Sequence, residues 1–244
     1  MIFAFWCLEF YHCYELLKSG EIGLVYMAQI EEIKTETDLQ FFGQISASIS
    51  HELKNVLAII NENAGLLEDF TLMADRGVPL DPARLSAMAF GVQKQVERAN
   101  RILNNMNRFA HSTDQILTTV DLVQTIELIM ALTARFAAMQ GVEVSLQPPG
   151  RPVALETAPY SLMHLVWLCL EFSMSAGGDE KKVAMVVEAA ADSVQIRFGR
   201  LTGLTDAMLT AFPSDRERIL LETLGAELTA DPARNEIVID MKTG

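Results

Sequence analysis

The composition and charge of the chain exclude several classes of function. It has 244 residues, 50% of them hydrophobic and 21% charged, so it can bury a core large enough for two modest domains. Acidic residues outnumber basic ones by 32 to 19, and the formal net charge of −13 repels nucleic-acid phosphates and anionic membrane surfaces. The three cysteines lack CxxC spacing, which favours reduced thiols. We therefore expect a cytoplasmic globular protein that binds no nucleic acid and does not insert into a membrane.

The first 26 residues form the most hydrophobic segment of the chain. This segment is too short and too often interrupted by polar residues to span a bilayer, and it lacks the basic start of a signal peptide. Because the composition changes at Met27, we interpret residues 1–36 as an N-terminal extension that is flexible or non-native. The natural start would then lie near Met27.

Two long helices are predicted next, over residues 37–74 and 82–112, and they are joined by the turn RGVPLDP. In both helices, apolar residues recur at steps of three and four. They are Phe42, Ile45, Ile49, Leu53, Val56, Ile60 and Leu67 in the first, and Leu85, Met88, Val92, Val96, Ala99, Leu103, Met106 and Ala110 in the second. Such stripes predict an antiparallel hairpin. Because one hairpin cannot cover both stripes, we expect a homodimer that closes a four-helix bundle.

His51 lies in the first helix, and its place on the helix surface follows from a rotation of about 100° per residue. Relative to the centre of the apolar stripe, His51 falls at about 180° and faces solvent. Asn55 lies about 40° from His51, one turn further along, and Glu62 lies about 20° from it. The small residues Ala47 and Ala58 leave the imidazole uncrowded. By itself, this pattern also fits a solvated histidine on a polar face.

The segment SHELKNVL, residues 50–57, resembles the phosphoacceptor box of two-component sensor histidine kinases, which typically reads S-H-E-L-[RK]-[TN]-P-L. Val56 stands where that family usually has proline, so we expect no proline bend in the helix. The second helix continues the resemblance with ERANRILNNMNRFAHS, residues 97–112. The resemblance extends over nearly the whole chain from Leu39 onward, and the histidine box is its most specific part.

In that family the histidine is a nucleophile. The resemblance implies that a neutral nitrogen of His51 attacks a phosphoryl group and later passes it to an aspartate of a partner. It implies that Glu52 orients or deprotonates the ring. Asn55 completes the spacing E-x-x-[TN], which is typical of kinases that also dephosphorylate their partner. The docking surface for response-regulator receiver domains would be the face around the histidine, formed by Ala47, Lys54, Ala58 and Glu62. The alternative interpretation is that these polar residues are ordinary solvated side chains.

The C-terminal half, residues 116–244, has the element order of an α/β sandwich. Helices are predicted at residues 122–140, 159–176 and 216–224, and strands at residues 141–146, 153–156, 183–188, 193–198, 227–229 and 236–240. This order resembles the ATPase domain that follows the dimerisation helices of histidine kinases. The expected fold class is therefore α+β: a dimerising and phosphotransfer helical hairpin over residues 37–115, then a degenerate ATPase-like α/β sandwich with a truncated lid.

The nucleotide site of that family is degenerate in this chain. Leu168 and Phe172 stand where the family has asparagines, one of which holds Mg²⁺, and an apolar side chain cannot ligate magnesium. The family's D-x-G-x-G motif is replaced by GRLTGL, residues 199–204, and the lid region is poor in glycine. We predict that ATP binding is lost, that the chain has no cofactor or metal of its own, and that Mg²⁺ enters only through a partner receiver domain. His164 and Trp167, on the same helix as Leu168, are expected to be core residues.

A kinase-shaped dimer with a complete histidine box and no ATP site resembles the kinase-like histidine phosphotransferases. The expected function is transfer of a phosphoryl group, carried on His51, between the receiver aspartates of a phosphorelay. Three alternatives stay open. The chain could be a response-regulator phosphatase that uses Glu52 and Asn55, a non-catalytic dimer that only binds a response regulator, or an active kinase with unusual nucleotide contacts.

Overall fold

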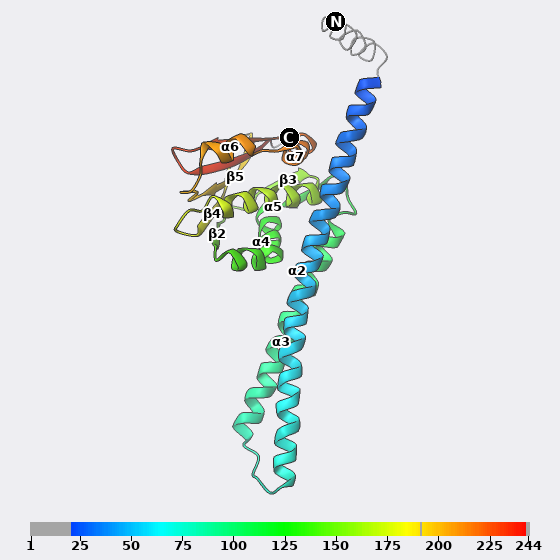
Figure 1. Cartoon of the computed structure of the whole chain (residues 1–244), viewed down its shortest axis with the longest axis vertical. Coiled ribbons are helices and arrows are strands. Elements are labelled where there is room, and N and C mark those ends of the chain that lie inside the picture. The colour runs from blue at the N-terminus through cyan, green and yellow to red at the C-terminus, as the bar shows by residue number, and fades with distance from the viewer. Residues whose placement is uncertain (1–20, 191, 243–244) are drawn as a thin grey trace, which may run out of the picture.

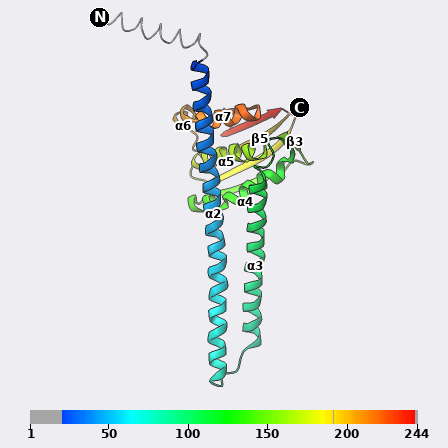
Figure 2. The same ribbon diagram turned by 90° about the vertical axis from the view of Figure 1, so that its right-hand side faces the viewer.

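The computed structural model describes residues 21–190 and 192–242 of the chain. A long helical hairpin stands beside an α/β domain that packs against the half of the hairpin remote from its closed end (Figures 1 and 2). The predicted fold class, α+β with a helical hairpin followed by an α/β sandwich, is confirmed. The first helix begins at Glu21, earlier than predicted, so residues 21–36 are helical. The first 20 residues of the predicted extension lie outside the described part of the chain.

The hairpin consists of α2 (Glu21–Asp75) and α3 (Pro82–His111), which run antiparallel. The carboxylate of Asp81 accepts a hydrogen bond from the backbone N–H of Ala83 at 2.9 Å and so caps the start of α3. Pro82 follows in the first helical position, where its missing N–H costs nothing. α2 continues without interruption through Val56.

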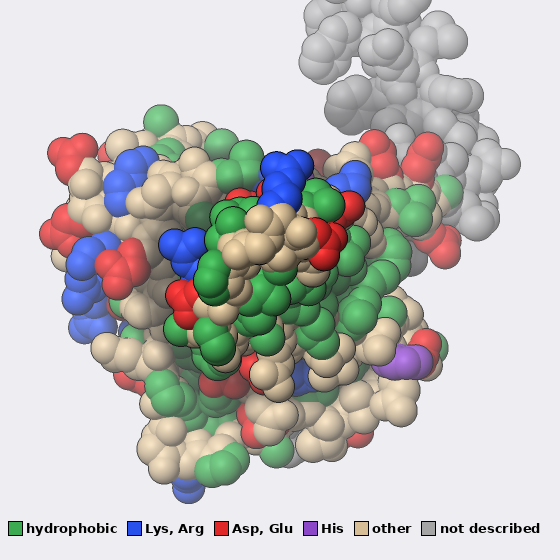
Figure 3. Space-filling model, turned by 90° about the horizontal axis from the view of Figure 1, so that it is seen from below, with side chains coloured by type: hydrophobic (Ala, Val, Ile, Leu, Met, Phe, Trp, Pro, Cys, Tyr) green, Lys and Arg blue, Asp and Glu red, His purple; other side chains and the backbone are tan. Residues whose placement is uncertain are grey.

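Only part of the predicted apolar stripe is buried. Ile45, Ile49 and Val56 of α2 are buried, because α3 and the α/β domain cover this side of the helix. Other members of the two stripes are exposed, namely Phe42, Leu67, Val96, Leu103 and Met106. Seen from its closed end, the hairpin shows extensive apolar surface (Figure 3). The homodimer that would cover these side chains stays a prediction.

The α/β domain contains all the helices and strands predicted for it, each within a few residues of its expected bounds. Its elements are β1 (Thr118–Asp121), α4 (Leu122–Gln140), β2 (Glu143–Gln147), β3 (Ala154–Thr157), α5 (Pro159–Ser175), β4 (Lys182–Ala189), β5 (Ser193–Gly199), α6 (Asp206–Ala211), α7 (Asp215–Leu224), β6 (Ala226–Asp231) and β7 (Glu236–Lys242). The sequence did not predict β1 and α6. Both are short, and β1 gains its partner from a distant segment, since it pairs with β3 in a separate two-stranded sheet.

The main sheet has five strands in the order β2-β4-β5-β7-β6, and only the β2–β4 pair is parallel. Alternate residues of its strands, such as Met185, Ile196 and Phe198, point into the core. Polar residues line the opposite face, where Arg197 forms ion pairs with Glu188 and Glu236. α4, α5 and α7 cover the apolar face, and α5 is buried along most of its length because the sheet, α4 and α7 all pack against it.

Among the described residues, α4 is the one helix long and apolar enough to cross a membrane. Its apolar side chains Leu122, Ile126 and Ile129 are instead fully buried in the core of the α/β domain. Asp121 caps the start of α4 by accepting from the backbone N–H of Gln124 at 3.1 Å. The predicted bounds of this helix, residues 122–140, are confirmed.

Candidate functional site

His51 lies near the middle of α2, and its side chain is exposed. The residues predicted to form the docking surface around it are exposed as well, as is Asn55; they are Ala47, Lys54, Ala58 and Glu62. Because all of these positions lie within about 60° of the histidine around the helix, one open face of α2 carries them. The imidazole and the side chains around it are therefore open to solvent in the described part of the chain.

Asn55 is the one residue of this face that contacts the imidazole. Its Nδ2 lies 3.4 Å from Nδ1 of His51. Positions four apart on a helix are neighbours on its surface, so the helix itself brings the two side chains together. Among the described residues, Nδ1 of His51 has this contact and Nε2 makes no hydrogen bond.

Glu52 points in a different direction from His51. Adjacent residues on a helix are separated by about 100°, and the half-buried carboxylate of Glu52 lies on the flank that faces α3. There it accepts a short hydrogen bond from the guanidinium of Arg98, which makes this contact an ion pair between the two helices of the hairpin. The predicted role of Glu52 as the base that orients the ring is untested, but its carboxylate is engaged by Arg98 in this structure.

Sequence reasoning did not single out Arg98. It lies 46 residues from Glu52 in the chain, and their meeting depends on the register between α2 and α3. A comparison of acidic residues on the flank of the first helix with basic residues on the second could have suggested such a pair.

A small cavity of about 280 Å³ lies beside this ion pair, between the hairpin and α4. Its lining includes Ser48 and Glu52 from α2, Asn105 from α3, and Arg135 from α4. The hydroxyl of Ser48 donates to the backbone carbonyl of Leu132 at 3.3 Å, so α4 lies close to α2 at this point. The α/β domain therefore forms one wall of the cavity that Glu52 lines.

The α/β domain is attached to the hairpin by a second group of contacts, further toward the start of α2. Nδ1 of the buried His164 lies 2.8 Å from Oδ1 of Asp38, and the imidazole stacks on the ring of Phe41 at a centroid distance of 4.5 Å. The hydroxyl of Tyr160 donates to the backbone carbonyl of Asp38 at 2.7 Å. Trp167 contributes a further hydrogen bond, from Nε1 to Gln44 Oε1 at 3.3 Å. The prediction that His164 and Trp167 are buried residues of α5 is confirmed.

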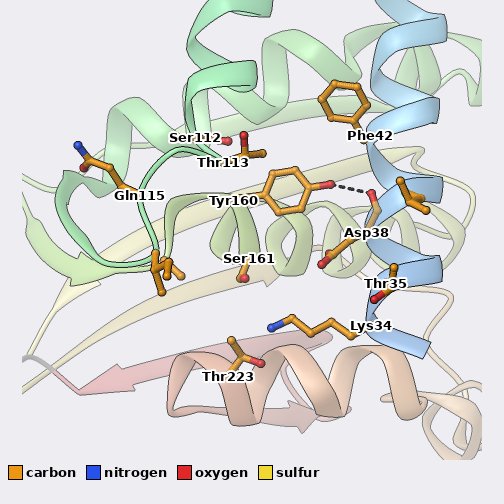
Figure 4. Close-up of a pocket in the computed structure, with 13 residues that line it drawn as sticks. Lys34, Thr35, Asp38, Phe42, Ser112, Thr113, Gln115, Tyr160, Ser161 and Thr223 are labelled. Atoms are coloured by element: carbon orange, nitrogen blue, oxygen red, sulfur yellow. Dashed lines mark hydrogen bonds between the residues drawn. The ribbon is translucent and has the colours of Figure 1, made fainter. Parts of the chain in front are cut away.

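A cleft of about 500 Å³ opens beside these contacts (Figure 4). Tyr160 projects across it toward Asp38, and Lys34, Ser112 and Thr223 line its other sides. Burial, and to a smaller extent the negative charge of Asp38, raises the pKa of Tyr160, so its phenol stays protonated and donates. Since Asp38 and His51 are separated by thirteen residues, or about 20 Å along α2, this cleft is distinct from the surroundings of His51.

Leu168 and Phe172, the two residues that stand at family asparagine positions in the resemblance, both make apolar contacts. Leu168 is buried in the core, and the ring of Phe172 stacks on that of Phe212 at a centroid distance of 4.0 Å. Phe212 belongs to the segment between α6 and α7, so this stack holds that segment against α5. Leu168 and Phe172 have apolar side chains, and neither can bind a magnesium ion.

The segment after β5 is also packed against the end of α5. The backbone N–H of Gly203 donates to the carbonyl of Ala176 at 2.9 Å. Gly178 has a φ of +59°, and a Cβ at this position would collide with Thr202. Leu201, which lies in the segment GRLTGL, is fully buried. The segment of residues 199–204 is therefore packed closely against the end of α5.

Comparisons with known proteins give structural neighbours only. No family model matches the chain, and a search of curated proteins finds no match. The catalytic domain of histidine kinase ThkA superposes with a TM-score of 0.44 and 12% identity, over 53% of this chain and 97% of that chain. The Acinetobacter baumannii histidine kinase AdeS gives a TM-score of 0.41 and 10% identity, over 80% of this chain and 97% of that chain.

A third neighbour is the crystal structure of histidine kinase ThkA in complex with the response regulator protein TrrA. It gives a TM-score of 0.43 and 14% identity, over 91% of this chain and 67% of that chain. All three neighbours are thus histidine kinases or their catalytic domains. At these scores and identities, the likeness concerns general shape alone.

Proposed function

We propose that this chain is a histidine phosphotransferase of a two-component phosphorelay, and that it carries a phosphoryl group on His51 between receiver aspartates without using ATP. The observation that carries the proposal is the exposed imidazole inside the SHELKN box, on an open face of α2. An ordinary surface histidine would need neither this box nor the uncrowded, small-residue neighbours Ala47 and Ala58.

The chemistry is a displacement at phosphorus. A lone pair on an imidazole nitrogen of His51 attacks the phosphoryl group of an aspartyl phosphate, and a nitrogen–phosphorus bond forms. The bond from phosphorus to the aspartate oxygen breaks, and its electrons return to the carboxylate. Attack by the aspartate of a second receiver reverses these events. Any Mg²⁺ that neutralises the phosphoryl charge would be held by the receiver domain.

The face around His51 suits a protein partner. Small side chains at Ala47 and Ala58 allow close approach of a backbone, and Lys54 offers an exposed positive charge to an acidic receiver. Glu62 lies on the same face. Its negative charge would repel acidic groups of the partner and so restrict how the partner docks. We propose that this face, presented twice by a homodimer, is the docking surface for receiver domains.

The filled nucleotide region supports a relay in preference to a kinase. Burial of Leu168 and the stack of Phe172 on Phe212 leave apolar groups where a triphosphate and its metal would need oxygen and nitrogen ligands. An active kinase would have to open these contacts before ATP could bind. We propose that the α/β domain serves to support the hairpin and to dock partners.

The proposal is tested by incubating the purified protein with a receiver domain that carries labelled aspartyl phosphate. We expect acid-labile label to appear on the wild type and to be absent from His51→Ala. His111→Ala is the matched control, because His111 is also an exposed histidine of the hairpin, and this variant should be labelled like the wild type.

Other outcomes of the same assay would contradict the proposal. Loss of label from the receiver that persists in His51→Ala but stops in Asn55→Ala would identify a phosphatase. If neither variant changes the fate of the label, the chain is a module that only binds the receiver. Label that reaches His51 from ATP in the absence of any receiver would identify a kinase.

A further inference from the structure

We propose that Asn55 is the positioning residue that sets which nitrogen of His51 carries the proton, while Arg98 holds Glu52 away from the ring. This inference deepens the proposed function, because it rests on His51 being the nucleophile. It differs from the role that the family resemblance implies, in which Glu52 orients the ring.

The first observation is the contact between the two side chains on the open face. Asn55 Nδ2 and His51 Nδ1 lie 3.4 Å apart, and both side chains are exposed. A carboxamide carries an acceptor oxygen and a donor nitrogen of nearly equal size, so half a turn of the amide exchanges the two groups facing the ring. In the observed orientation the donor Nδ2 faces Nδ1 and favours the proton on Nε2, whereas the turned amide would favour the proton on Nδ1.

The second observation is the engagement of Glu52. Its carboxylate is half-buried and bonded to the guanidinium of Arg98, across the hairpin and about 100° around the helix from His51. A charge-assisted hydrogen bond in a partly buried position is stronger than one between neutral groups in water. To reach the imidazole, Glu52 would have to give up this bond. Asn55 needs no such exchange.

The orientation of the amide decides whether the outer nitrogen can react. When Nδ2 faces the ring, it donates to Nδ1, the ring proton sits on Nε2, and the outer nitrogen has no free lone pair. When Oδ1 faces the ring, it accepts from Nδ1–H, and the lone pair of Nε2 points outward toward a phosphoryl group. On attack, the new bond forms at Nε2, the aspartate leaves as a carboxylate, and the proton on Nδ1 stays hydrogen-bonded to Oδ1.

The test measures the proton position directly, by nitrogen-15 NMR of the imidazole of His51 in the unphosphorylated wild type and variants, under conditions in which the ring is neutral. Asn55→Leu keeps a similar shape on an exposed helix position but removes the hydrogen bond, and Asn55→Asp offers only acceptor oxygens. Because Nδ2 faces Nδ1 in the structure and so favours the proton on Nε2, we expect the ratio of Nδ1–H to Nε2–H to rise about two- to tenfold in Asn55→Leu and further in Asn55→Asp. Glu52→Gln should leave this ratio unchanged.

The opposite pattern overturns the inference: a ratio that shifts in Glu52→Gln and stays constant in both Asn55 variants assigns the ring to Glu52. No partner and no phosphoryl group enter the NMR measurement, so its result is independent of the relay assay. If the ratio shifts as expected but His51 is never labelled by a receiver, the positioning role of Asn55 holds and the proposed function fails.

Discussion

His164 on α5 and Asp38 on α2 form a buried link between the two parts of the protein. Nδ1 of His164 lies 2.8 Å from Oδ1 of Asp38, and the imidazole is 2% exposed. The ring also lies flat against Phe41, with only 2° between the two planes. Since these contacts continue the core of the α/β domain into the hairpin, disturbance of the link should reduce the stability of the whole chain.

Removal of the Asp38 carboxylate should destabilise the protein, because it leaves the buried imidazole of His164 without its partner. We expect Asp38→Ala to lower the free energy of unfolding by about 1–3 kcal/mol, because Nδ1 of the buried His164 loses its carboxylate partner. Asp69→Ala is the matched control, since Asp69 is exposed on the same helix and makes no ion pair among the described residues. Urea denaturation measures both variants. Equal stability of the two would show that the link contributes nothing.

The ring of Phe41 should be the largest single apolar contribution of α2 to this link. It is buried, stacks on His164, and meets Phe109 edge to face at a centroid distance of 5.5 Å. We expect Phe41→Ala to cost about 3–5 kcal/mol, the usual range for a large buried aromatic side chain. Leu39→Ala, two residues away and 69% exposed, should cost less than about 0.5 kcal/mol in the same urea titration. A small loss for Phe41 would mean that water or a neighbouring side chain fills the site.

The exposed stripe of the hairpin should mediate the homodimer. Leu103 belongs to the predicted stripe and is 42% exposed in the single chain, so a partner hairpin would bury it. We expect Leu103→Asp to weaken dimerisation by about tenfold or more, because it places a charge inside an apolar interface. Met139→Asp is the control, since Met139 is 70% exposed on α4 and lies off the hairpin. Sedimentation equilibrium at several protein concentrations distinguishes the two variants, and an unchanged dimer in Leu103→Asp would place the interface elsewhere.

Magnesium ATP should leave the melting temperature unchanged. A ligand present at 100 times its dissociation constant stabilises a folded protein by about 2.7 kcal/mol, which corresponds to several degrees for a chain of this size. Because Phe172 of α5 stacks on Phe212 in the segment between α6 and α7, we expect no such shift. Magnesium without nucleotide is the control in a thermal-shift series at millimolar ATP. A shift that saturates with ATP concentration would contradict the loss of the nucleotide site.

The regular elements were predictable from local patterns, whereas the contacts between them were not. α5 could be recognised from its continuous apolar run, and the strands from their alternation, because each pattern is set by neighbours in the sequence. The burial of His164 followed from the same pattern. Its partner did not, because Asp38 lies 126 residues away and their meeting depends on how the hairpin packs on the α/β domain.

The candidate site divides in the same way. The exposure of His51 and its closeness to Asn55 followed from helix geometry alone, since both depend on a rotation of about 100° per residue. The partner of Glu52 could not be read from the box, because Arg98 comes from the other helix of the hairpin. The family resemblance placed Glu52 beside the ring as a chemical partner, whereas the folded chain directs its carboxylate to the opposite helix.

Cys169 should make the stability of the protein fall at alkaline pH. Burial, and to a smaller extent the charge of Glu217, raises the pKa of its thiol far above the usual value in the folded state. Above about pH 8.5 the thiol of the unfolded chain loses its proton while the buried thiol keeps it, so the unfolded state binds fewer protons and the free energy of unfolding decreases. The contribution of Cys169 approaches about 1.4 kcal/mol per pH unit.

Cys169→Ala should lose this contribution, so the wild type and the variant should converge in stability between pH 8 and pH 10. Urea denaturation at a fixed protein concentration measures the difference at each pH, and the other two cysteines, present in both proteins, cancel in the comparison. A difference that stays constant across this range would mean that the thiol ionises equally in both states, and Cys169 would then have to be open to solvent in the folded protein.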